Sequence, residues 1–352
     1  MDLHAAVAVS MLPASRARAC AIFKALRQAH PSAGPVEVLE GLGVPPGERL
    51  PIAQRAGEAA SRALDAAPPL GIAPIPWFDP RYSALLECTT DPPPVLWARG
   101  DASCLSLRAV AIVGSRAATP YALDVAQRLA AELAGRGIVV ASGLARGADS
   151  AAHRGALDAA GRTIAVLGSG LDQVYPAEHQ ELADIIAETG LLISELGPGA
   201  YPLPEHFPLR NRIISGISLA VVVVEASEKS GSLITARCAM EQGRDVMAVP
   251  GSILTGRNRG SHSLLKDGAR MVETADDILD ELGWPGVRLE PAPVRKGPRD
   301  PVLARLEPGE GSSLDELVEA TGVLPSRLLT RLMELELDGH VRRDGGRFFR
   351  LR

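Results

Sequence analysis

Several residue types are scarce in this sequence of 352 residues, and each scarcity excludes a class of protein. Aromatic residues make up only 3%, so an aromatic side chain at a candidate site is informative. The four cysteines are scattered without CxxC or CxxH spacing, which argues against a zinc ribbon and a disulfide framework and fits a reducing compartment. The formal net charge is -5, so a polyanionic partner would need a local basic site on an acidic body.

Long apolar runs and familiar cofactor motifs are missing as well. The longest apolar stretch, Leu219–Val224, is far too short to span a bilayer. The N-terminus has Asp2 and His4 instead of the basic run of a signal peptide, so we expect a cytoplasmic protein. Neither GxGxxG nor GxxxxGK[ST] occurs, which argues against a dinucleotide redox site and a P-loop hydrolase. The histidines are dispersed without HExxH, so the sequence predicts no metal site, cofactor or catalytic group.

Composition divides the chain into three parts. Residues 1–66 are rich in alanine at helical spacing and predict a small helical domain. Residues 67–285 open with a proline-rich lead-in over 67–94 and continue with short aliphatic segments between amphipathic helices. A second proline-rich stretch over 286–299 predicts a stiff linker to a last domain over 300–352.

The aliphatic segments of the central part are nearly continuous runs of Val, Ile and Leu, as strands covered on both faces require. Their alternation with helices implies right-handed crossovers. This pattern predicts an α/β fold with a Rossmann-like, doubly wound and mostly parallel sheet. The expected strands are 110–113, 138–141, 163–167, 191–194, 219–224 and 246–249.

The last part predicts a winged-helix domain. Ser313 and Glu316 form a capping box that opens one helix, and Pro325 opens the next. Asp344-Gly345-Gly346 then turns a hairpin.

Loops that follow the expected strands predict a phosphate-binding edge. Open parallel sheets bind ligands at the carboxyl ends of their strands. One glycine-rich turn would be weak evidence, because glycine there usually serves backbone geometry alone. Four such turns on one edge favour an anion held by backbone N–H groups and helix N-termini. The loop residues are Gly114, Ser115, Ser142, Gly143, Gly147, Gly168, Gly170, Ser230, Gly231 and Ser232, and the cations beside them are Arg116 and Arg146.

A second segment has the composition of a single-strand nucleic-acid site, in which a ring stacks on a base and cations hold the backbone. It combines one aromatic, two guanidinium groups and one amide: Phe207, Arg210, Asn211 and Arg212. Alternatively, Phe207 is a core residue and the two arginines pair with Glu195 or Glu205. For Phe207 both interpretations stay open, whereas the neighbouring loops favour ligand contact by the arginines. For Asp149, Asp172 and His153 we favour capping, ion pairing or packing over acid–base chemistry.

These motifs, in their order and spacing over about residues 80–285, resemble the DprA/Smf DNA-processing family. The resemblance implies an N-terminal SAM-like helical domain and a C-terminal winged helix. It also implies a cytoplasmic protein of natural transformation that binds single-stranded DNA without sequence preference, protects it and loads the recombinase RecA onto it. Members form homodimers through the Rossmann-like domain and have no established catalytic activity or cofactor.

The resemblance also implies particular DNA contacts. It would place the DNA against Arg116, Arg146, Phe207, Arg210, Asn211, Arg212 and Lys229, with Arg162 nearby, before the third expected strand. The winged helix departs from a major-groove reader, because residues 298–352 hold nine basic and ten acidic side chains. Only its wing is clearly basic, through Arg342, Arg343, Arg347 and Arg350, so it predicts contact with a duplex backbone or a protein partner.

Two other functions are compatible with parts of the sequence. The first is a phosphoribohydrolase that uses Gly231-Ser232 with Glu225 or Glu241, although the loop lacks the paired glycines and following Gly-Thr of such enzymes. The second is an adaptor whose terminal domains carry the partner contacts, which is compatible with DNA binding by the central part.

Overall fold

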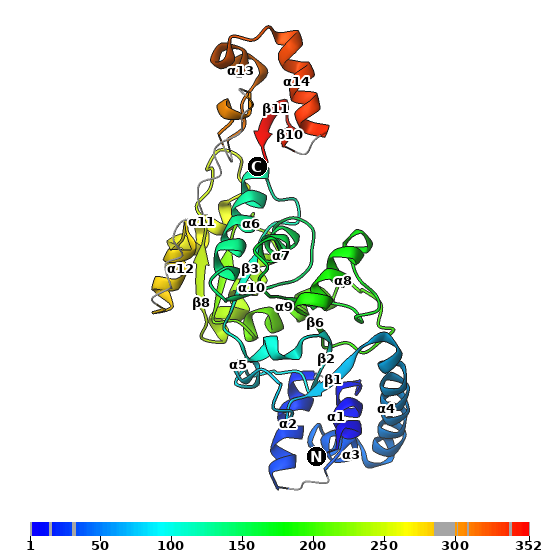
Figure 1. Cartoon of the computed structure of the whole chain (residues 1–352). Coiled ribbons are helices and arrows are strands. Elements are labelled where there is room, and N and C mark those ends of the chain that lie inside the picture. The colour runs from blue at the N-terminus through cyan, green and yellow to red at the C-terminus, as the bar shows by residue number, and fades with distance from the viewer. Residues whose placement is uncertain are drawn as a thin grey trace.

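The computed structural model describes residues 2–13, 16–29, 33–284, 300, 302–307, 310–337 and 340–351. The linker expected over 286–299 lies outside these residues. Within the described ranges, no helix combines the length and apolarity needed to cross a membrane. Figure 1 shows the N-terminal helices at one end of the molecule, the large sheet in the middle, and the C-terminal helices and hairpin at the other end.

All six strands expected from the aliphatic runs are present, with ends shifted by at most one residue. They are β3 (Ala109–Val113), β4 (Val139–Ser142), β5 (Thr163–Leu167), β6 (Leu191–Ser194), β7 (Ala220–Val223) and β8 (Asp245–Ala248). Together they contain almost only buried residues, as expected for strands covered on both faces.

The strand order confirms the doubly wound, Rossmann-like fold. The sheet runs β1-β2-β6-β5-β4-β3-β7-β8-β9, and neighbours from β6 to β9 pair in parallel. The chain moves outward from β3 through β4 and β5 to β6, and then returns to place β7 on the other side of β3. The order therefore reverses between β3 and β7, where open sheets of this kind leave a crevice for ligands.

Three strands were not expected from the sequence. They are β1 (Ala73–Pro76), β2 (Val95–Gly100) and β9 (Arg270–Met271). β2 pairs antiparallel with β6, and β1 pairs antiparallel with β2 at the outer edge. Pro74 and Pro76 are tolerated in β1 because an edge strand has a neighbour on only one side. The proline-rich lead-in thus extends the sheet instead of remaining a plain connector.

Helices cover both faces of the sheet, and side chains alternate between the two cores. Val110 and Ile112 of β3 pack into one core, while Ala111 and Val113 pack into the other. One face is covered by α6 (Pro120–Ala134), α7 (Ala148–Asp158), α8 (Gln180–Thr189) and α12 (Ala275–Glu281). The other face is covered by α5 (Ala84–Glu87), α9 (His206–Gly216), α10 (Ser232–Glu241) and α11 (Arg259–Lys266).

The N-terminal helices share a core with the β2 side of the sheet. They are α1 (Leu3–Ser10), α2 (Arg16–Ala29), α3 (Pro35–Gly41) and α4 (Pro46–Ala66). Apolar residues of α1, among them Val7 and Val9, belong to the same buried cluster as Trp97 of β2. Burial of this apolar surface stabilises the contact between the helices and the sheet.

The C-terminal part is a winged helix with a separate apolar core. Its elements are the 3-10 turn Leu303–Arg305, α13 (Leu314–Thr321), α14 (Pro325–Leu337), β10 (Val341–Asp344) and β11 (Arg347–Arg350). The predicted capping box is present, because Ser313 Oγ accepts from the Glu316 amide at 3.3 Å and Glu316 accepts from the Ser313 amide at 2.7 Å. Before α13, the described residues of this domain form only one 3-10 turn, where a first helix was expected.

Replacing Gly155 by Ala should destabilise the protein, although Ala is ordinarily favoured in a helix by about 0.5–1 kcal/mol. Gly155 lies in α7 against α6, and a Cβ there would overlap the backbone carbonyl oxygen of Gln127. We expect a loss of about 1–3 kcal/mol in the free energy of unfolding, as at other overpacked sites.

Gly57→Ala is the matched control for this change. A Cβ at Gly57 in α4 would lie 3.6 Å from the nearest atom of His4, an ordinary contact. This variant should be as stable as the wild type or more stable. Urea denaturation of both variants measures the difference, and equal midpoints would contradict the close packing of α6 on α7.

Candidate nucleic-acid interface

A cleft of about 630 Å³ opens at the carboxyl ends of β3 and β7, where the strand order reverses. Ten of the residues expected to contact DNA line it: Gly114, Ser115, Arg116, Phe207, Arg210, Asn211, Lys229, Ser230, Gly231 and Ser232. A smaller adjoining space is lined by Gly143 and Arg146 as well as Arg116 and Phe207. Four separated stretches of the sequence therefore meet at one edge of the sheet.

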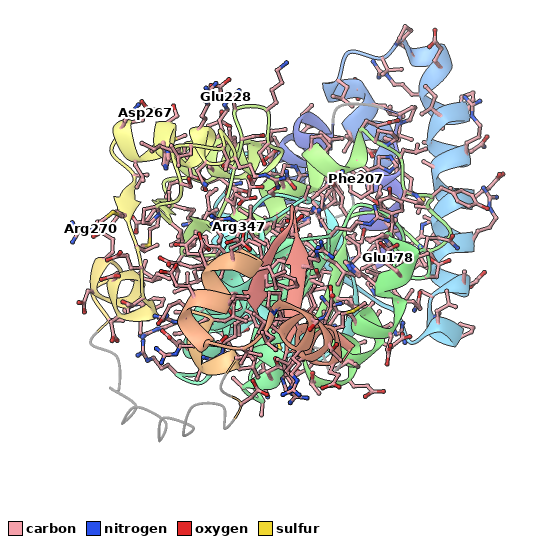
Figure 2. The ribbon with its side chains drawn as sticks, turned by 90° about the horizontal axis from the view of Figure 1, so that it is seen from above. Glu178, Phe207, Glu228, Asp267, Arg270 and Arg347 are labelled. Atoms are coloured by element: carbon pink, nitrogen blue, oxygen red, sulfur yellow. The ribbon has the colours of Figure 1, made fainter. Side chains whose placement is uncertain are left out.

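An aromatic pair forms one rim of the cleft. The rings of Phe207 and Tyr175 lie 5.4 Å apart between centroids, and the Arg116 guanidinium lies 5.5 Å from the Phe207 centroid. Phe207 is half-buried and Tyr175 is 43% exposed. The Phe207 ring packs against Gly168 of the loop after β5 and lines the cleft. Figure 2 labels Phe207 and Glu178, which lie on the same side of the wing residue Arg347 in that view. Tyr175 was not predicted from the sequence, although an aromatic residue in a loop after a strand was the available signal.

Arg210 is buried at the floor of the cleft and holds its loops together. Its guanidinium donates to the backbone carbonyls of Gly143, at 2.7 Å, and of Val166. It also faces the carboxylate of Asp149, which accepts from the Gly143 amide at 3.1 Å. Arg210 is only 6% exposed, so the expectation of an open cation that contacts ligand is replaced by a positioning role.

Burial shifts the pKa values of both Asp149 and Arg210. Desolvation raises the pKa of Asp149, while Arg210 and the backbone amides of Ala145 and Gly143 oppose that shift. Desolvation also lowers the pKa of Arg210 to about 10. At position 143 only glycine leaves room, because a Cβ there would stand 2.5 Å from an Arg210 nitrogen.

The remaining loop residues shape the backbone and do not line the cleft. The Ser142 hydroxyl is buried and donates to the Ile112 carbonyl at 2.6 Å. Gly147 has φ +78°, and a Cβ there would overlap the Ser115 carbonyl oxygen. Gly168 packs under the Phe207 ring, and the Gly170 amide donates to the Ala200 carbonyl at 2.8 Å.

Arg212 does not line the cleft and is paired with two carboxylates, in line with the ion-pair interpretation. Its guanidinium lies 2.7 Å from Glu195 and 3.0 Å from Asp91, and its side chain is only 11% exposed. These ion pairs support the alternative interpretation of Arg212 over the expectation that it contacts a ligand. Two residues apart in a helix with 3.6 residues per turn, Arg210 and Arg212 lie on nearly opposite sides of α9 and meet different surroundings.

Arg162 lies at the amino end of β5, whereas the cleft opens at the carboxyl ends of the parallel strands. It precedes β5, whereas the cleft residues follow the strands, so the strand length separates Arg162 from the cleft. There it pairs with Asp101 at 3.3 Å. The expectation that Arg162 lies near the other cations is wrong.

Arg146 is exposed at the mouth of the smaller space and makes a two-point contact with Glu178, at 2.5 and 3.0 Å. Hydrogen bonding from Arg146 lowers the pKa of Glu178. Because both side chains are about half-exposed, water and ions compete with this pair. Another anion can therefore replace Glu178 as the partner of Arg146.

The carboxylates required by a phosphoribohydrolase are engaged or displaced. Glu225 is buried and accepts from the Thr119 amide at 3.3 Å and from its hydroxyl at 2.6 Å, at the N-terminus of α6. Glu241 ends α10 and is exposed. Neither lines the cleft. Within the described ranges, no cluster of three or more His, Cys, Asp and Glu could hold a metal ion.

His153 belongs to α7, is fully buried and does not line the cleft. Its Nδ1 lies 2.7 Å from the Thr163 hydroxyl oxygen. That hydroxyl donates to the Val140 carbonyl at 2.6 Å, so it accepts from His153 Nδ1–H. Burial lowers the pKa of His153 to about 3, which keeps the ring neutral.

Comparisons with known proteins agree with this geometry. Residues 74–283 match the family described as DNA recombination-mediator protein A, and residues 288–347 match the DprA winged helix domain. DNA processing protein DprA of Bacillus subtilis is 45% identical over 222 residues, which cover 63% of this chain and 75% of that protein.

Two solved structures are similar as well. DNA processing protein A from Streptococcus pneumoniae is 33% identical with a TM-score of 0.73, over 80% of this chain and 98% of that chain. A structure of DNA processing protein A from Helicobacter pylori, described by its single-stranded DNA binding mode, is 31% identical with a TM-score of 0.53. That match covers 60% of this chain and 95% of the Helicobacter pylori chain.

The buried His153 should make the protein sensitive to acid. Its pKa is about 3 in the folded protein, against an ordinary value of 6.5. Between these values the unfolded chain binds a proton that the folded protein does not, so stability falls as the pH drops. His153→Gln removes this titration while its amide can still donate to Thr163. We expect the variant to lose less stability than the wild type between pH 7 and pH 4.

Thermal unfolding at a series of pH values measures this difference. Parallel dependence on pH in the two proteins would show that His153 does not contribute to the acid sensitivity.

Proposed function

The chain belongs to the DprA/Smf family, and from this membership and the cleft we propose that it binds single-stranded DNA without sequence preference. We propose further that it protects the strand and passes it to the recombinase RecA in the cytoplasm, without catalysing a reaction itself. The family description as a recombination mediator supports the second step. The observation that carries the first is the meeting of an aromatic rim and fixed cations at the switch point of the sheet.

The cleft offers a different contact for each part of a nucleotide. The faces of Phe207 and Tyr175 accept bases by stacking, which every base can do. Arg116 stands over the same ring, and Lys229 lines the cleft from the loop before α10, so both can contact phosphates. Because stacking and phosphate contacts carry no sequence information directly, binding should be independent of sequence.

The start of α10 adds neutral phosphate donors. Ser230 and Ser232 line the cleft with their hydroxyl oxygens 2.8 Å apart, and Gly231 precedes the first turn of the helix. Backbone N–H groups at a helix N-terminus favour a bound anion. Arg146 would join them by exchanging Glu178 for a phosphate, at little cost because that pair is exposed.

We propose that the cleft binds DNA without a catalytic acid or base. Glu225 caps α6, and Asp149, although it lines the cleft, accepts from the Gly143 and Ala145 amides and faces Arg210, so both carboxylates are engaged within the protein. This arrangement supports a binding protein over a hydrolase of nucleotides.

The terminal parts would serve partner contacts. We propose a homodimer through the Rossmann-like domain, as the family membership implies. In the winged helix, Arg331 of α14 is paired with Asp300 at 2.8 Å and with Glu334 at 2.5 Å. The exposed cations of the wing, Arg342 and Arg343, remain for a duplex backbone or a protein partner.

Arg116→Ala should weaken binding of oligo-dT about tenfold or more, because it removes a cation that holds a phosphate next to the stacking ring. The slope of log affinity against log salt should fall by about 0.7 for each phosphate that the variant no longer neutralises. Fluorescence anisotropy at several salt concentrations measures both quantities.

Arg162→Ala is the matched control, since it removes a guanidinium at the opposite edge of the sheet. It should leave affinity and salt slope unchanged. Unchanged affinity in Arg116→Ala would contradict the proposed cleft.

Removing residues 286–352 should leave oligo-dT binding within about twofold of the full chain. The winged helix has its own apolar core, and no residue described there lines the cleft. A gel shift of the shortened and full chains checks this, and a large loss of binding would transfer the main site to the C-terminal domain.

A further inference from the structure

Tyr201 is a large aromatic side chain left in the open. Of the four tyrosines, Tyr82 is buried and Tyr121 is half-buried, whereas Tyr201 is 72% exposed. Its ring and hydroxyl make no ring contact or hydrogen bond with any residue that the structure describes. Aromatic rings bury a large apolar area and usually do so within the fold. An exposed ring in so aromatic-poor a chain therefore calls for a partner outside it.

The loop that carries Tyr201 lies beside the aromatic rim. Gly168 and Gly170 follow β5, and they contact Phe207 and Ala200, respectively. A Cβ at Gly168 would lie 3.0 Å from the Phe207 ring, and the Gly170 amide donates to the Ala200 carbonyl at 2.8 Å. Ala200 directly precedes Tyr201, so the segment that carries the exposed ring is hydrogen-bonded to the loop that packs against Phe207.

The chain between Tyr201 and the cleft is short and stiff. Pro204 lines the cleft, and Pro202 and Pro204 restrict the backbone over the intervening residues. On the other side of Tyr201, Asp172 accepts from the Gly199 amide at 2.9 Å and fixes the loop. Leu203, at 44% exposed, adds apolar surface between Tyr201 and the cleft.

We propose that Tyr201 is an additional stacking platform for single-stranded DNA, which receives a base of the strand after it leaves the cleft past Phe207 and Tyr175. This inference rests on the proposed function. The charge of this loop supports stacking over a phosphate contact, because the carboxylate of Asp172 accepts from the Gly199 amide and Glu205 follows four residues after Tyr201. Tyr201 thus extends the binding track through ring–base contact alone.

Stacking and phosphate contact leave different signatures in binding data. Removing a cation that neutralises a phosphate reduces the salt slope, whereas removing a stacking ring lowers affinity without releasing fewer counterions. Stacking on one side chain contributes enough that its removal weakens binding about fivefold or more. Tyr201 should matter only for strands long enough to extend beyond the cleft.

The test uses the full chain and two oligo-dT probes, one that only fills the cleft and one several nucleotides longer. Tyr201→Ala should weaken binding of the long probe about fivefold or more, with an unchanged salt slope and an unchanged affinity for the short probe. Tyr201→Phe should retain wild-type affinity, because it keeps the ring. The exposed position makes unfolding of either variant unexpected, and thermal unfolding checks that both remain folded.

A fluorescent variant reports the contact directly. Tyr201→Trp should be quenched when the long probe binds, since a stacked base quenches indole emission. Leu50→Trp, at a 61% exposed position of α4, is the matched control and should not respond.

The outcomes separate this inference from the proposed function. If the wild type does not bind either probe, the proposed function fails, and the inference fails with it. If the wild type binds and Tyr201→Ala binds the long probe equally well, the cleft stands and the platform is overturned. Loss of affinity in Tyr201→Phe equal to that in Tyr201→Ala would also overturn it, because the hydroxyl and not the ring would then make the contact.

Discussion

The candidate site depends on the hydrogen bonds that the buried guanidinium of Arg210 makes. This guanidinium ties α9 to the loop after β4 through the Gly143 carbonyl and to β5 through the Val166 carbonyl, and it faces the Asp149 carboxylate. Each of these polar groups would be costly to bury alone. Because they satisfy one another, α9 is held where its first turn can present Phe207 to the cleft.

Charge is divided between the interior and the surface of this site. Arg210 is buried and Arg212 is mostly covered, and both are bound to acceptors of the protein, so they organise the loops. Arg116, Arg146 and Lys229 are not buried, and they border the two adjoining spaces. A chain of net charge -5 can therefore offer a basic track to a polyanion while its other surfaces remain acidic.

The sequence predicted the central sheet well because buried parallel strands require aliphatic runs, and such runs are visible without a structure. It missed β1 and β2 because prolines obscured an edge strand and its neighbour. For the site, the glycine loops were found because their geometry is local. The roles of Arg162, Arg210 and Arg212 depend on which end of a strand or side of a helix faces the cleft, and composition does not encode that. Tyr201 stands out only when its exposure is known.

The central claim is that this cleft accepts a single strand through stacked bases, which a duplex keeps inside its own helix. The most direct measurement compares the affinity of the full chain for a single strand and for a duplex of the same length at the same salt concentration. The account predicts clearly tighter binding of the single strand. Equal or tighter binding of the duplex would contradict it.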